Sequence, residues 1–526
     1  MKQKYFIISL LFSIVAFTSC KDTWEEHYNE SNSIKSDLNL YDYIKSQSDL
    51  STFSEMLDIA GFDSILNKPQ TYTVWVPVNA ALESVNLNDT TLVVSIVRNH
   101  ISRFSYSTSD IVSKTIYMLD KKFLNFSLLG AGYIFGGKNL IQTDIATDNG
   151  IIHTLDGYIP YLSNIWEFIG RTEGLDSLKA YLYSQSTSVF DEAASVEIGT
   201  NEFNQAVYDS VIIFSNPILD KIGYLQTEDS LFAAILPNNT AWTKVYNQVE
   251  SKYKTLDSEG GAPQQRLNTQ YAIVENLIFK FKDLPIDPTS YDSLRTTTGT
   301  LFKPSSDLFI GSTKHTLSNG VAYLADSLRF KASESWQKPI VVEAENSSYG
   351  RSFSYSSLFV RSSLGTSFET SDDKYLVSEA LTVSRTTPNS VTFPIPNTLS
   401  GKYKVYAVFV PSSIVLETDE RTYKVRFAFS YIDSNAVQKN DLAINSKNGI
   451  ATTPGSIGAS FETKSDSITK MFVTEIDFPY CNIYDEESSI SDISVRLKVE
   501  NAALITELAK YDRTLRIDYI ILEPVE

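Results

Sequence analysis

Residues able to perform acid–base, nucleophilic or metal chemistry are unevenly supplied in this sequence. Carboxylates are plentiful, with 63 Asp and Glu, whereas only 4 His and 2 Cys are present. The sequence has no glycine-rich phosphate loop, no His pair at zinc-binding spacing and no Gly-x-Ser-x-Gly nucleophile elbow. Scattered carboxylates leave paired-acid glycoside cleavage open as an alternative. No catalytic residue is singled out, and we therefore expect a protein that binds its ligand without turnover.

Composition and charge narrow the class of ligand. The chain has 526 residues and a formal net charge of −18, which disfavours nucleic acid and anionic lipid surfaces because both require basic patches. The length corresponds to about three or four domains. Apolar residues make up 42% of the chain, enough for packed cores, and the many Tyr and Phe favour strands over helical bundles.

The N-terminus has the pattern of a targeting segment. Two Lys precede an apolar run over residues 5–17, too short to cross a bilayer as a helix. Phe17-Thr18-Ser19-Cys20 resembles a bacterial lipobox, with a small residue before the Cys. We interpret residues 1–20 as a lipoprotein signal peptide, with Cys20 becoming the lipid-bearing (palmitate-carrying) first residue. An ordinary secretory signal with a chance Cys is the alternative.

Residues 21–37 are polar and are predicted to be a tether. The acidic residues Asp22, Glu25 and Glu26 resemble the short export signal of surface lipoproteins in some Gram-negative bacteria; a solvated acidic tether is the alternative. From the signal and the acidic residues together, we expect the protein to be lipid-anchored at the outer membrane and to face the cell exterior. Once Cys20 is lipidated only Cys481 remains, so no internal disulfide can form.

The segment 38–162 alternates between helical and strand patterns. Apolar spacing predicts helices between residues 40 and 60 and over 89–101, and a strand over 71–77. Asn79 is placed to cap the helix that follows this strand. An Asn-Gly turn at 149–150 leads into a further strand.

Three landmarks of this segment resemble those of the fasciclin-like (FAS) domain family. They are Thr-Val-Trp-Val-Pro-Val-Asn-Ala-Ala at 73–81, Asn-His-Ile at 99–101 and Asn-Gly-Ile-Ile-His at 149–153. The family usually has Tyr-His where this chain has Asn99-His100. The resemblance implies an α+β domain over 38–162 and a role in adhesion.

The same landmarks recur about 160 positions later. Residues 231–242, 274–278 and 319–326 parallel the strand, the helix end and the Asn-Gly turn. We interpret residues 163–332 as a second, divergent fasciclin-like domain, which a duplication would produce. The stretch 251–265 reads as an inserted loop.

Comparing the two copies suggests what the histidines do. His100 corresponds to Leu277 and His153 to Tyr323. A position that accepts Leu is typical of packing, so we predict that both histidines are buried and structural; a catalytic or ligand role is the alternative. Gly150 and Gly320, its counterpart in the second copy, each follow an Asn in a turn and are predicted to adopt a positive φ.

Beyond residue 333 the helical spacing disappears. Apolar residues alternate with polar ones over 402–409, 423–429 and 494–500, and Pro, Gly and Asn stretches separate these segments. Period-two patterns of this kind predict an all-β antiparallel sandwich over 333–526.

Short motifs in this segment resemble those of galactose-binding-like jelly rolls, and in particular family-six-type carbohydrate-binding modules. They are the Glu-Ala-Glu opening at 343–345, the Gly-Lys-Tyr-Lys-Val-Tyr-Ala stretch at 401–407 and the closing Asp-Tyr-Ile at 518–520. The resemblance implies a carbohydrate ligand.

The resemblance also implies a structural calcium site formed by Glu343, Glu345 and Asp518. Residues two apart on a strand share a face, so Glu343 and Glu345 can point together. Paired carboxylates supply the hard oxygen ligands that calcium prefers. A solvated pair of carboxylates on an edge strand is the alternative.

In such modules sugars lie on aromatic rings in loops. The candidates here, in predicted loops or strand ends, are Trp336, Tyr349, Tyr355 and Tyr511. Core or scattered surface positions are the alternative for each.

The sequence thus predicts a multidomain surface lipoprotein with two α+β fasciclin-like domains and a C-terminal all-β jelly roll. Its expected partner is a polysaccharide or oligosaccharide, with outer-membrane transporter subunits as possible neighbours and calcium as its only expected cofactor. It contacts the membrane through the lipid anchor alone and does not bind nucleic acid. The alternative is a protein–protein adhesin or complex-assembly subunit that binds no sugar.

Overall fold

The computed structural model describes residues 34–525, apart from 201–205, 284–285, 383–385, 447–448, 452–454 and 486–487. The predicted signal peptide, Cys20 and most of the predicted tether lie outside this part of the chain. Within it, no helix is both long and apolar enough to cross a membrane. Compactness divides the chain into two units, one made of residues up to Phe168 with 225–231 and 316–320, the other of the remainder.

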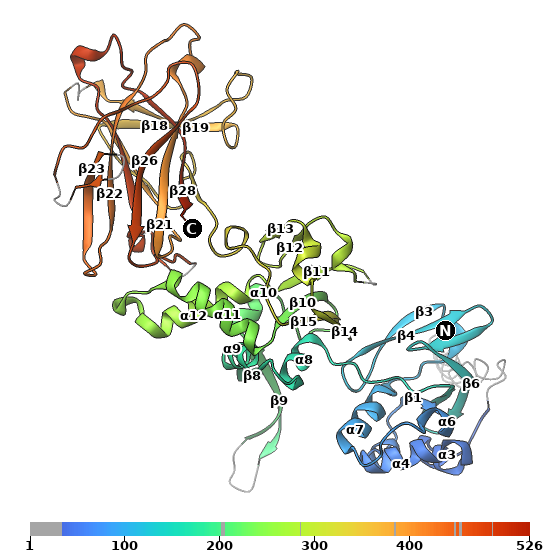
Figure 1. Cartoon of the computed structure of the whole chain (residues 1–526). Coiled ribbons are helices and arrows are strands. Elements are labelled where there is room, and N and C mark those ends of the chain that lie inside the picture. The colour runs from blue at the N-terminus through green and yellow to red at the C-terminus, as the bar shows by residue number, and fades with distance from the viewer. Residues whose placement is uncertain are drawn as a thin grey trace, which may run out of the picture. The chain divides into compact units, whose positions relative to one another are not determined.

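The first fasciclin-like segment is built on a seven-stranded sheet in the order β2-β1-β7-β6-β5-β4-β3. Figure 1 labels β1, β3, β4 and β6 of this sheet. The strands are β1 Tyr72–Pro77, β2 Ile101–Arg103, β3 Ser113–Tyr117, β4 Phe123–Leu129, β5 Gly132–Phe135, β6 Lys138–Thr147 and β7 Gly150–Leu155. Strands β1 and β7 pair in parallel. Both are almost entirely buried, as expected for central strands covered on both faces.

Helices and aromatic rings supply the two cores beside this sheet. The helices are α3 Leu40–Ser46, α4 Ser51–Ile59, α5 Asp63–Leu66, α6 Asn79–Leu82 and α7 Thr90–Asn99. Their apolar faces, including Phe53 and Ile96, form one core with β1 and β7. A second core gathers around Trp75, Phe126 and Phe135. Trp75 stacks on Phe135 with ring centroids 3.9 Å apart.

The second fasciclin-like segment repeats the central part of this topology. Its sheet has the order β11-β10-β15-β14, which matches β2-β1-β7-β6. The main strands are β10 Leu231–Pro237, β11 Ile278–Phe281, β14 Thr313–Leu317 and β15 Gly320–Ala325, with a short hairpin of β12 Leu294–Arg295 and β13 Leu301–Phe302. The helices are α8 Ile165–Arg171, α9 Asp176–Ser184, α10 Pro217–Ile222, α11 Asn239–Val249 and α12 Gly261–Val274. A ribbon of β8 Thr187–Thr200 and β9 Ala206–Ser215 separates α9 from α10.

Three local predictions in these segments are wrong. Asn79 does not cap the helix that follows it, because its Oδ1 accepts the backbone N–H of Thr52 in α4 at 2.9 Å. Gly150 has no positive φ; a Cβ there would lie 2.1 Å from the Tyr72 carbonyl oxygen, so close approach of the backbones requires glycine. Residues 251–265 are not an open loop, since they contain two 3-10 turns and the start of α12.

The C-terminal segment is the predicted two-sheet sandwich. The first sheet has the order β18-β19-β28-β21-β26, with β16 also on β28, and the second runs β17-β20-β27-β22-β23-β24, with β25 on β22. The first sheet contains β16 Ile340–Glu343, β18 Ser356–Ser362, β19 Lys374–Ala380, β21 Gly401–Phe409, β26 Thr469–Phe478 and β28 Leu515–Pro524. The second contains β17 Ser352–Ser354, β20 Ser390–Pro394, β22 Lys424–Ile432, β23 Gln438–Ser446, β24 Gly449–Ile450, β25 Phe461–Glu462 and β27 Arg496–Asn501.

The alternating segments lie where their pattern predicts. Tyr403, Val405 and Phe409 of β21 point into the core, as do Phe427 of β22 and Leu497 of β27. The predicted fold class, two α+β fasciclin-like domains followed by an all-β sandwich, is therefore confirmed.

Candidate functional site

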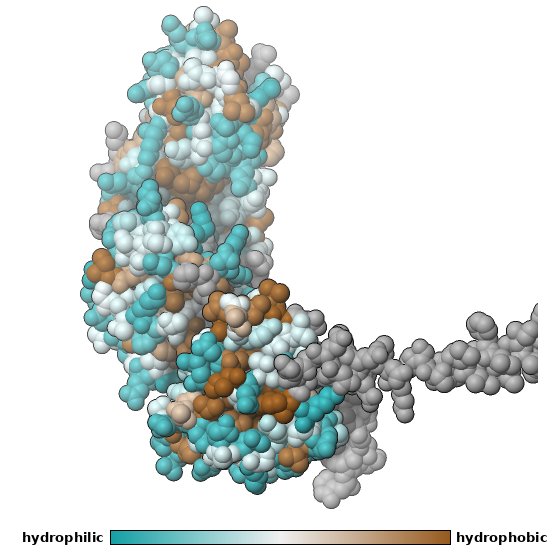
Figure 2. Space-filling model, turned by 90° about the vertical axis from the view of Figure 1, so that its right-hand side faces the viewer, coloured by the Kyte–Doolittle hydropathy of each residue, from teal (hydrophilic) through white to brown (hydrophobic). Residues whose placement is uncertain are grey.

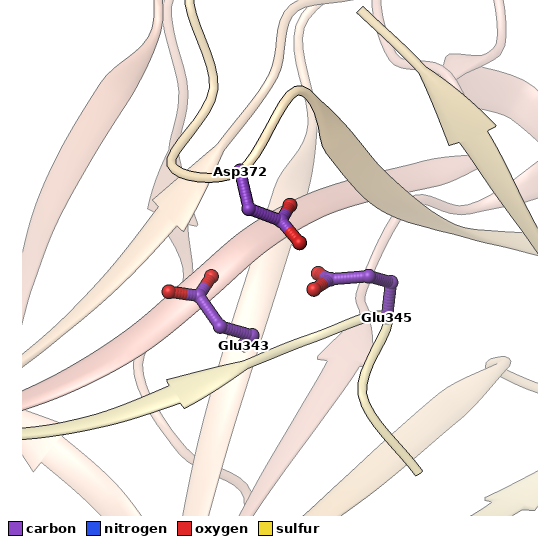
Figure 3. A group of neighbouring side chains, drawn as sticks. All are labelled: Glu343, Glu345 and Asp372. Carbon is purple, nitrogen blue, oxygen red and sulfur yellow. The ribbon is translucent and has the colours of Figure 1, made fainter.

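Acidic side chains converge where two strands share one edge of β28. Strand β16 pairs with residues 519–522 of β28, and β19 pairs with residues 515–517. The end of β16 and the loop before β19 therefore meet beside Asp518. This junction brings Glu343 and Glu345 close to Asp372, as Figure 3 shows.

The carboxylate oxygens of this acidic cluster, formed by Glu343, Glu345 and Asp372, are close enough to share one cation. One oxygen from each of the three lies within 4.8 Å of the others. Two oxygens bound to one calcium ion at its usual distances can be up to about 5 Å apart. Glu343 Oε2 and Glu345 Oε2 are buried and have no hydrogen-bond partner among the described residues, which is costly for oxygens of an ionised group unless a cation binds them.

Ser371 connects the cluster to Asp518. Its backbone N–H donates to Asp518 Oδ1 at 3.1 Å, and its hydroxyl donates to Glu343 Oε1 at 2.8 Å. Asp518 is 2% exposed. Asp518 therefore lies beside the cluster and positions Ser371.

The electrostatics of the site oppose ionisation. Burial raises the pKa of Asp518 to about 7. The hydrogen bond from the Ser371 N–H lowers this pKa, whereas the negative charges of Glu343 and Glu345 raise it further. Burial is also the largest cause of the raised pKa of Glu343 and of Glu345, to which neighbouring carboxylates add. Lys374 offsets part of this charge from the surface, with its Nζ 3.6 Å from Asp372. The donor set, all carboxylate oxygens, is one that a hard divalent cation would stabilise.

Asp372 was not among the predicted ligands. Its only sequence signal is the acidic pair Asp372-Asp373, which looks like any solvated turn. Its role depends on the register of β19 against β28, which the sequence does not show. The grouping of Glu343 with Glu345 and the nearness of Asp518 agree with the sequence analysis, while the metal itself stays a prediction.

The four predicted aromatic ligands lie in different surroundings. Trp336 is half-buried in a turn. Tyr349 is half-buried and lies edge-on to Tyr484, with ring centroids 5.5 Å apart. Tyr355 is 51% exposed between β17 and β18. Among the described side chains, no ring contact joins any two of the predicted four.

Tyr511 is unsuited to stacking on a sugar. It is 8% exposed, and its hydroxyl is 3.1 Å from Glu462 and 2.8 Å from the Lys510 ammonium. The ammonium groups of Lys424 and Lys510 also lie 5.5 Å and 4.7 Å from the ring centroid. Its faces and its polar end are thus used within the sandwich.

Phe353, which the sequence analysis did not select, lies near Tyr355. Phe353 is 54% exposed at the edge of the second sheet. Tyr355 has a φ of +52°, and its carbonyl accepts the N–H of Leu381, which is 40% exposed. Phe353, Tyr355 and Leu381 together are the exposed edge patch of the sandwich. A bulky residue held at positive φ is unusual.

The buried histidines are structural, as the comparison of the copies predicts. His100 Nε2 accepts the Ile159 N–H at 3.0 Å, so Nδ1 carries the proton and donates to the Ile96 carbonyl at 2.7 Å. Likewise, His153 Nδ1 accepts the Asp144 N–H and Nε2 donates to the Tyr106 carbonyl. Both rings are fully buried, and burial lowers the pKa of each, that of His100 to about 4.

These observations define a protein of two α+β modules and a β-sandwich that carries an acidic cluster. The sequence pattern of the fasciclin domain matches residues 48–160, so this part of the chain is a fasciclin domain. No curated protein matches the chain.

Several solved structures have similar parts. A FAS1 domain pair from the insect cell adhesion molecule Fasciclin I has 15% identity and a TM-score of 0.21, covering 54% of this chain and 98% of that one. A family 35 carbohydrate-binding module from Clostridium thermocellum has 9% identity and a TM-score of 0.17, covering 36% and 99%. The CBM22-1 xylan-binding domain from Paenibacillus barcinonensis Xyn10C has 11% identity and a TM-score of 0.21, covering 36% and 95%. Because these TM-scores are low, the strand order and core packing of the chain itself define its fold.

Proposed function

We propose that this protein is a non-catalytic binding protein whose C-terminal sandwich binds an extracellular glycan. The observation that carries this proposal is the exposed edge patch of Phe353, Tyr355 and Leu381. The C–H face of a pyranose packs on an aromatic ring, and such rings are costly to expose without a partner. The hydrogen bond from the Leu381 N–H holds the Tyr355 backbone in place, which lowers the entropy cost of ordering this segment when a sugar binds.

A glycan array probed with the whole protein tests this proposal. Tyr355→Ala should weaken binding to a retained glycan about tenfold, whereas Tyr355→Phe should keep most of the affinity because it keeps the ring. Tyr511→Phe is the matched control, since that ring is buried within the sandwich. Retention on no polysaccharide would reject glycan binding, and release of reducing sugars would reject a role without turnover.

The acidic cluster, in the same proposal, holds a structural calcium ion. Glu343, Glu345 and Asp372 would hold it, since one oxygen of each lies within 4.8 Å of the others, which is a spacing that calcium can bridge. Glu343 and Glu345 each contribute a buried oxygen that accepts no hydrogen bond from the described residues. The ion would supply positive charge at the junction of β16 and β19 and so tie these strands to β28. Its role would be to stabilise the edge of the sandwich.

Thermal unfolding with and without calcium tests the ion. EDTA should lower the melting temperature by several degrees and added calcium should restore it, because a ligand bound only to the folded state stabilises that state. Asp372→Asn should abolish this difference. Glu379→Gln, which changes an exposed carboxylate on β19, should leave it intact. A melting temperature indifferent to EDTA would exclude the site.

The proposal also places the protein on the outer membrane, anchored through Cys20 and serving as accessory subunit of a polysaccharide uptake complex. Its support is the lipobox-like pattern at residues 17–20. Cys20→Ala should release the protein into the soluble fraction. Partitioning of that variant with membranes would contradict the anchor. The alternative, a protein–protein adhesin without sugar binding, would be favoured by co-purification of a membrane partner together with no glycan retention.

A further inference from the structure

The ribbon of β8 and β9 is an insertion that the fasciclin-like fold does not need. In the first copy, α4 and α5 are separated only by residues 60–62. The matching helices of the second copy, α9 and α10, are separated by residues 185–216. The first copy forms a complete sheet and core without such a ribbon, so the ribbon serves some purpose other than folding.

Two sets of contacts establish that these helices match. Asn79 binds the second residue of α4, Thr52, and Asn239 binds the second residue of α9, Ser177, both through Oδ1 and the backbone N–H. The end of α5 and the chain just after α10 are held by a second matching pair of contacts, in which the Nδ2 groups of Asn149 and Asn319 donate to the carbonyls of Leu66 and Leu225. The insertion therefore lies at one defined point of the fold.

The ribbon presents apolar side chains to solvent. Val189 and Ile213 are direct cross-strand partners, so they share one face, and they are 57% and 49% exposed. Phe190, on the other face, is 41% exposed. An isolated two-stranded ribbon is at best marginally stable in water, and exposed apolar side chains on both faces are typical of a surface that a partner covers.

Both edges of the ribbon are also available for pairing. Within the described part of the chain, β8 and β9 pair only with each other. Figure 1 shows β9 leading away from α9. Unpaired edges carry backbone N–H and C=O groups that can accept a further strand.

The charge of the ribbon selects the kind of partner. Residues 186–216 contain five carboxylates and no Lys, Arg or His. Of the five, Asp191 and Glu192 lie in the described part of β8, and Glu192 is exposed. Edge pairing of two copies would place like charges together, which is unfavourable. A strand that carries Lys or Arg would instead be attracted.

We propose that the β8–β9 ribbon is a docking arm that pairs edge to edge with an extended polypeptide segment in which basic residues alternate with apolar ones. The apolar residues would cover Val189 and Ile213, and the basic residues, which point to the opposite face, would lie near Glu192. This surface is independent of the sandwich and of any glycan. It gives the protein a second binding function, directed at a protein partner.

Fluorescence anisotropy with labelled nine-residue peptides and the whole protein tests the arm. The probe alternates Lys and Val. One control alternates Glu and Val, and the other is the Lys-Val peptide N-methylated at every residue, which keeps its charge but has no backbone N–H to donate along either edge. We expect the Lys-Val peptide to bind at least tenfold more tightly than either control. Equal binding of the N-methylated peptide would overturn edge pairing.

Two variants assign the binding to the ribbon. Asp191→Lys with Glu192→Lys should reverse the preference towards the Glu-Val peptide. Replacing residues 187–215 by a three-residue link like Ala60-Gly61-Phe62 should abolish binding while circular dichroism and the melting temperature stay close to those of the parent. Undiminished binding to either variant would overturn the proposal. A dimer that forms only with the ribbon present, seen by sedimentation velocity, would show instead that a second copy is the partner.

Discussion

The two fasciclin-like copies keep the same polar contacts and differ in what fills the space around them. In the first copy Asn149 Oδ1 accepts the N–H of Leu40, the first residue of α3, and its Nδ2 donates to the carbonyls of Leu66 and Lys68 at the end of α5. In the second, Asn319 makes the same contacts with Ile165, the first residue of α8, and with two carbonyls after α10. Each Asn thus joins two helices and a strand turn.

The apolar surroundings diverge much further. The first copy extends its sheet with β5, β4 and β3 and packs Trp75 against aromatic rings there, whereas the second has the β8–β9 ribbon. Position 100 is a buried His in the first copy, and the corresponding position is Leu277 in the second. Apolar packing accepts many side chains of suitable volume. A buried backbone group, by contrast, must find a hydrogen-bond partner, and this explains why the Asn residues recur.

The largest expected loss of stability comes from substitutions that remove the hydrogen bonds shared by Asn149 and Asn319. Asn149→Ala and Asn319→Ala should each lower the free energy of unfolding by about 4 kcal/mol, because two buried backbone groups and one part-buried carbonyl lose their partner. Differential scanning calorimetry would resolve the transitions of the two copies. Asn88→Ala and Asn247→Ala, at exposed positions, are matched controls and should change little. A similar, small loss in all four variants would show that the shared contacts are not what the fold requires.

The next effect concerns the histidine that only the first copy has. The pKa of His100 is lowered to about 4 by burial, so the unfolded chain binds a proton more readily than the folded one. The stabilising effect of the neutral ring is complete above about pH 6.5, and up to about 3 kcal/mol of stability is lost as the pH falls from 6.5 through 4. His153 adds a loss of the same sign.

Changing His100 to the residue of the other copy tests this effect. His100→Leu should lower stability at neutral pH, because the Ile96 carbonyl and the Ile159 N–H lose their partner. It should also make the acid-induced loss between pH 6.5 and 4 distinctly smaller. Urea denaturation at several pH values measures both. An unchanged pH dependence would mean that His100 is not the titrating group.

The smallest effect concerns the glycine of the Asn-Gly pair, which the two copies need for different reasons. Gly320 has a φ of +144°, whereas Gly150 has no positive φ and lies against the Tyr72 carbonyl. Gly150→Ala should cost about 2 kcal/mol through this clash. Gly61→Ala, at a φ of +70° with no atom within 4 Å, should cost about 1 kcal/mol from strain alone. Equal losses in urea denaturation would argue against the clash.

Patterns along the chain were enough to predict most elements and few contacts between them. The helix at 90–99, the strand at 72–77 and the alternating strands of the sandwich follow local periodicity, which reflects burial of one face. Asn79 shows where prediction from a local pattern fails. Its position before a helix predicted a local cap, yet its side chain binds Thr52, 27 residues earlier in the chain, because the packing of α4 on the sheet places that N–H within reach.

In the candidate sites, too, some groupings could be predicted from the sequence and others depended on tertiary contacts. Glu343 and Glu345 could be paired from their spacing, because side chains two apart on a strand point the same way. Asp372 could not be added, since its place depends on β16 and β19 sharing one edge of β28. Tyr511 and Tyr355 are both tyrosines near strand ends, and only their exposure, 8% against 51%, separates a core ring from a surface one.

The sequence by itself determined the modular order of this protein: two related α+β copies, then a sandwich. It could do so because hydrophobic periodicity and recurring turn residues are local properties. Tertiary structure alone decided which carboxylates meet, which rings face solvent and where the second copy projects its ribbon. Those outcomes depend on strand register and on contacts between residues far apart in the chain, and neither can be read from the local sequence pattern.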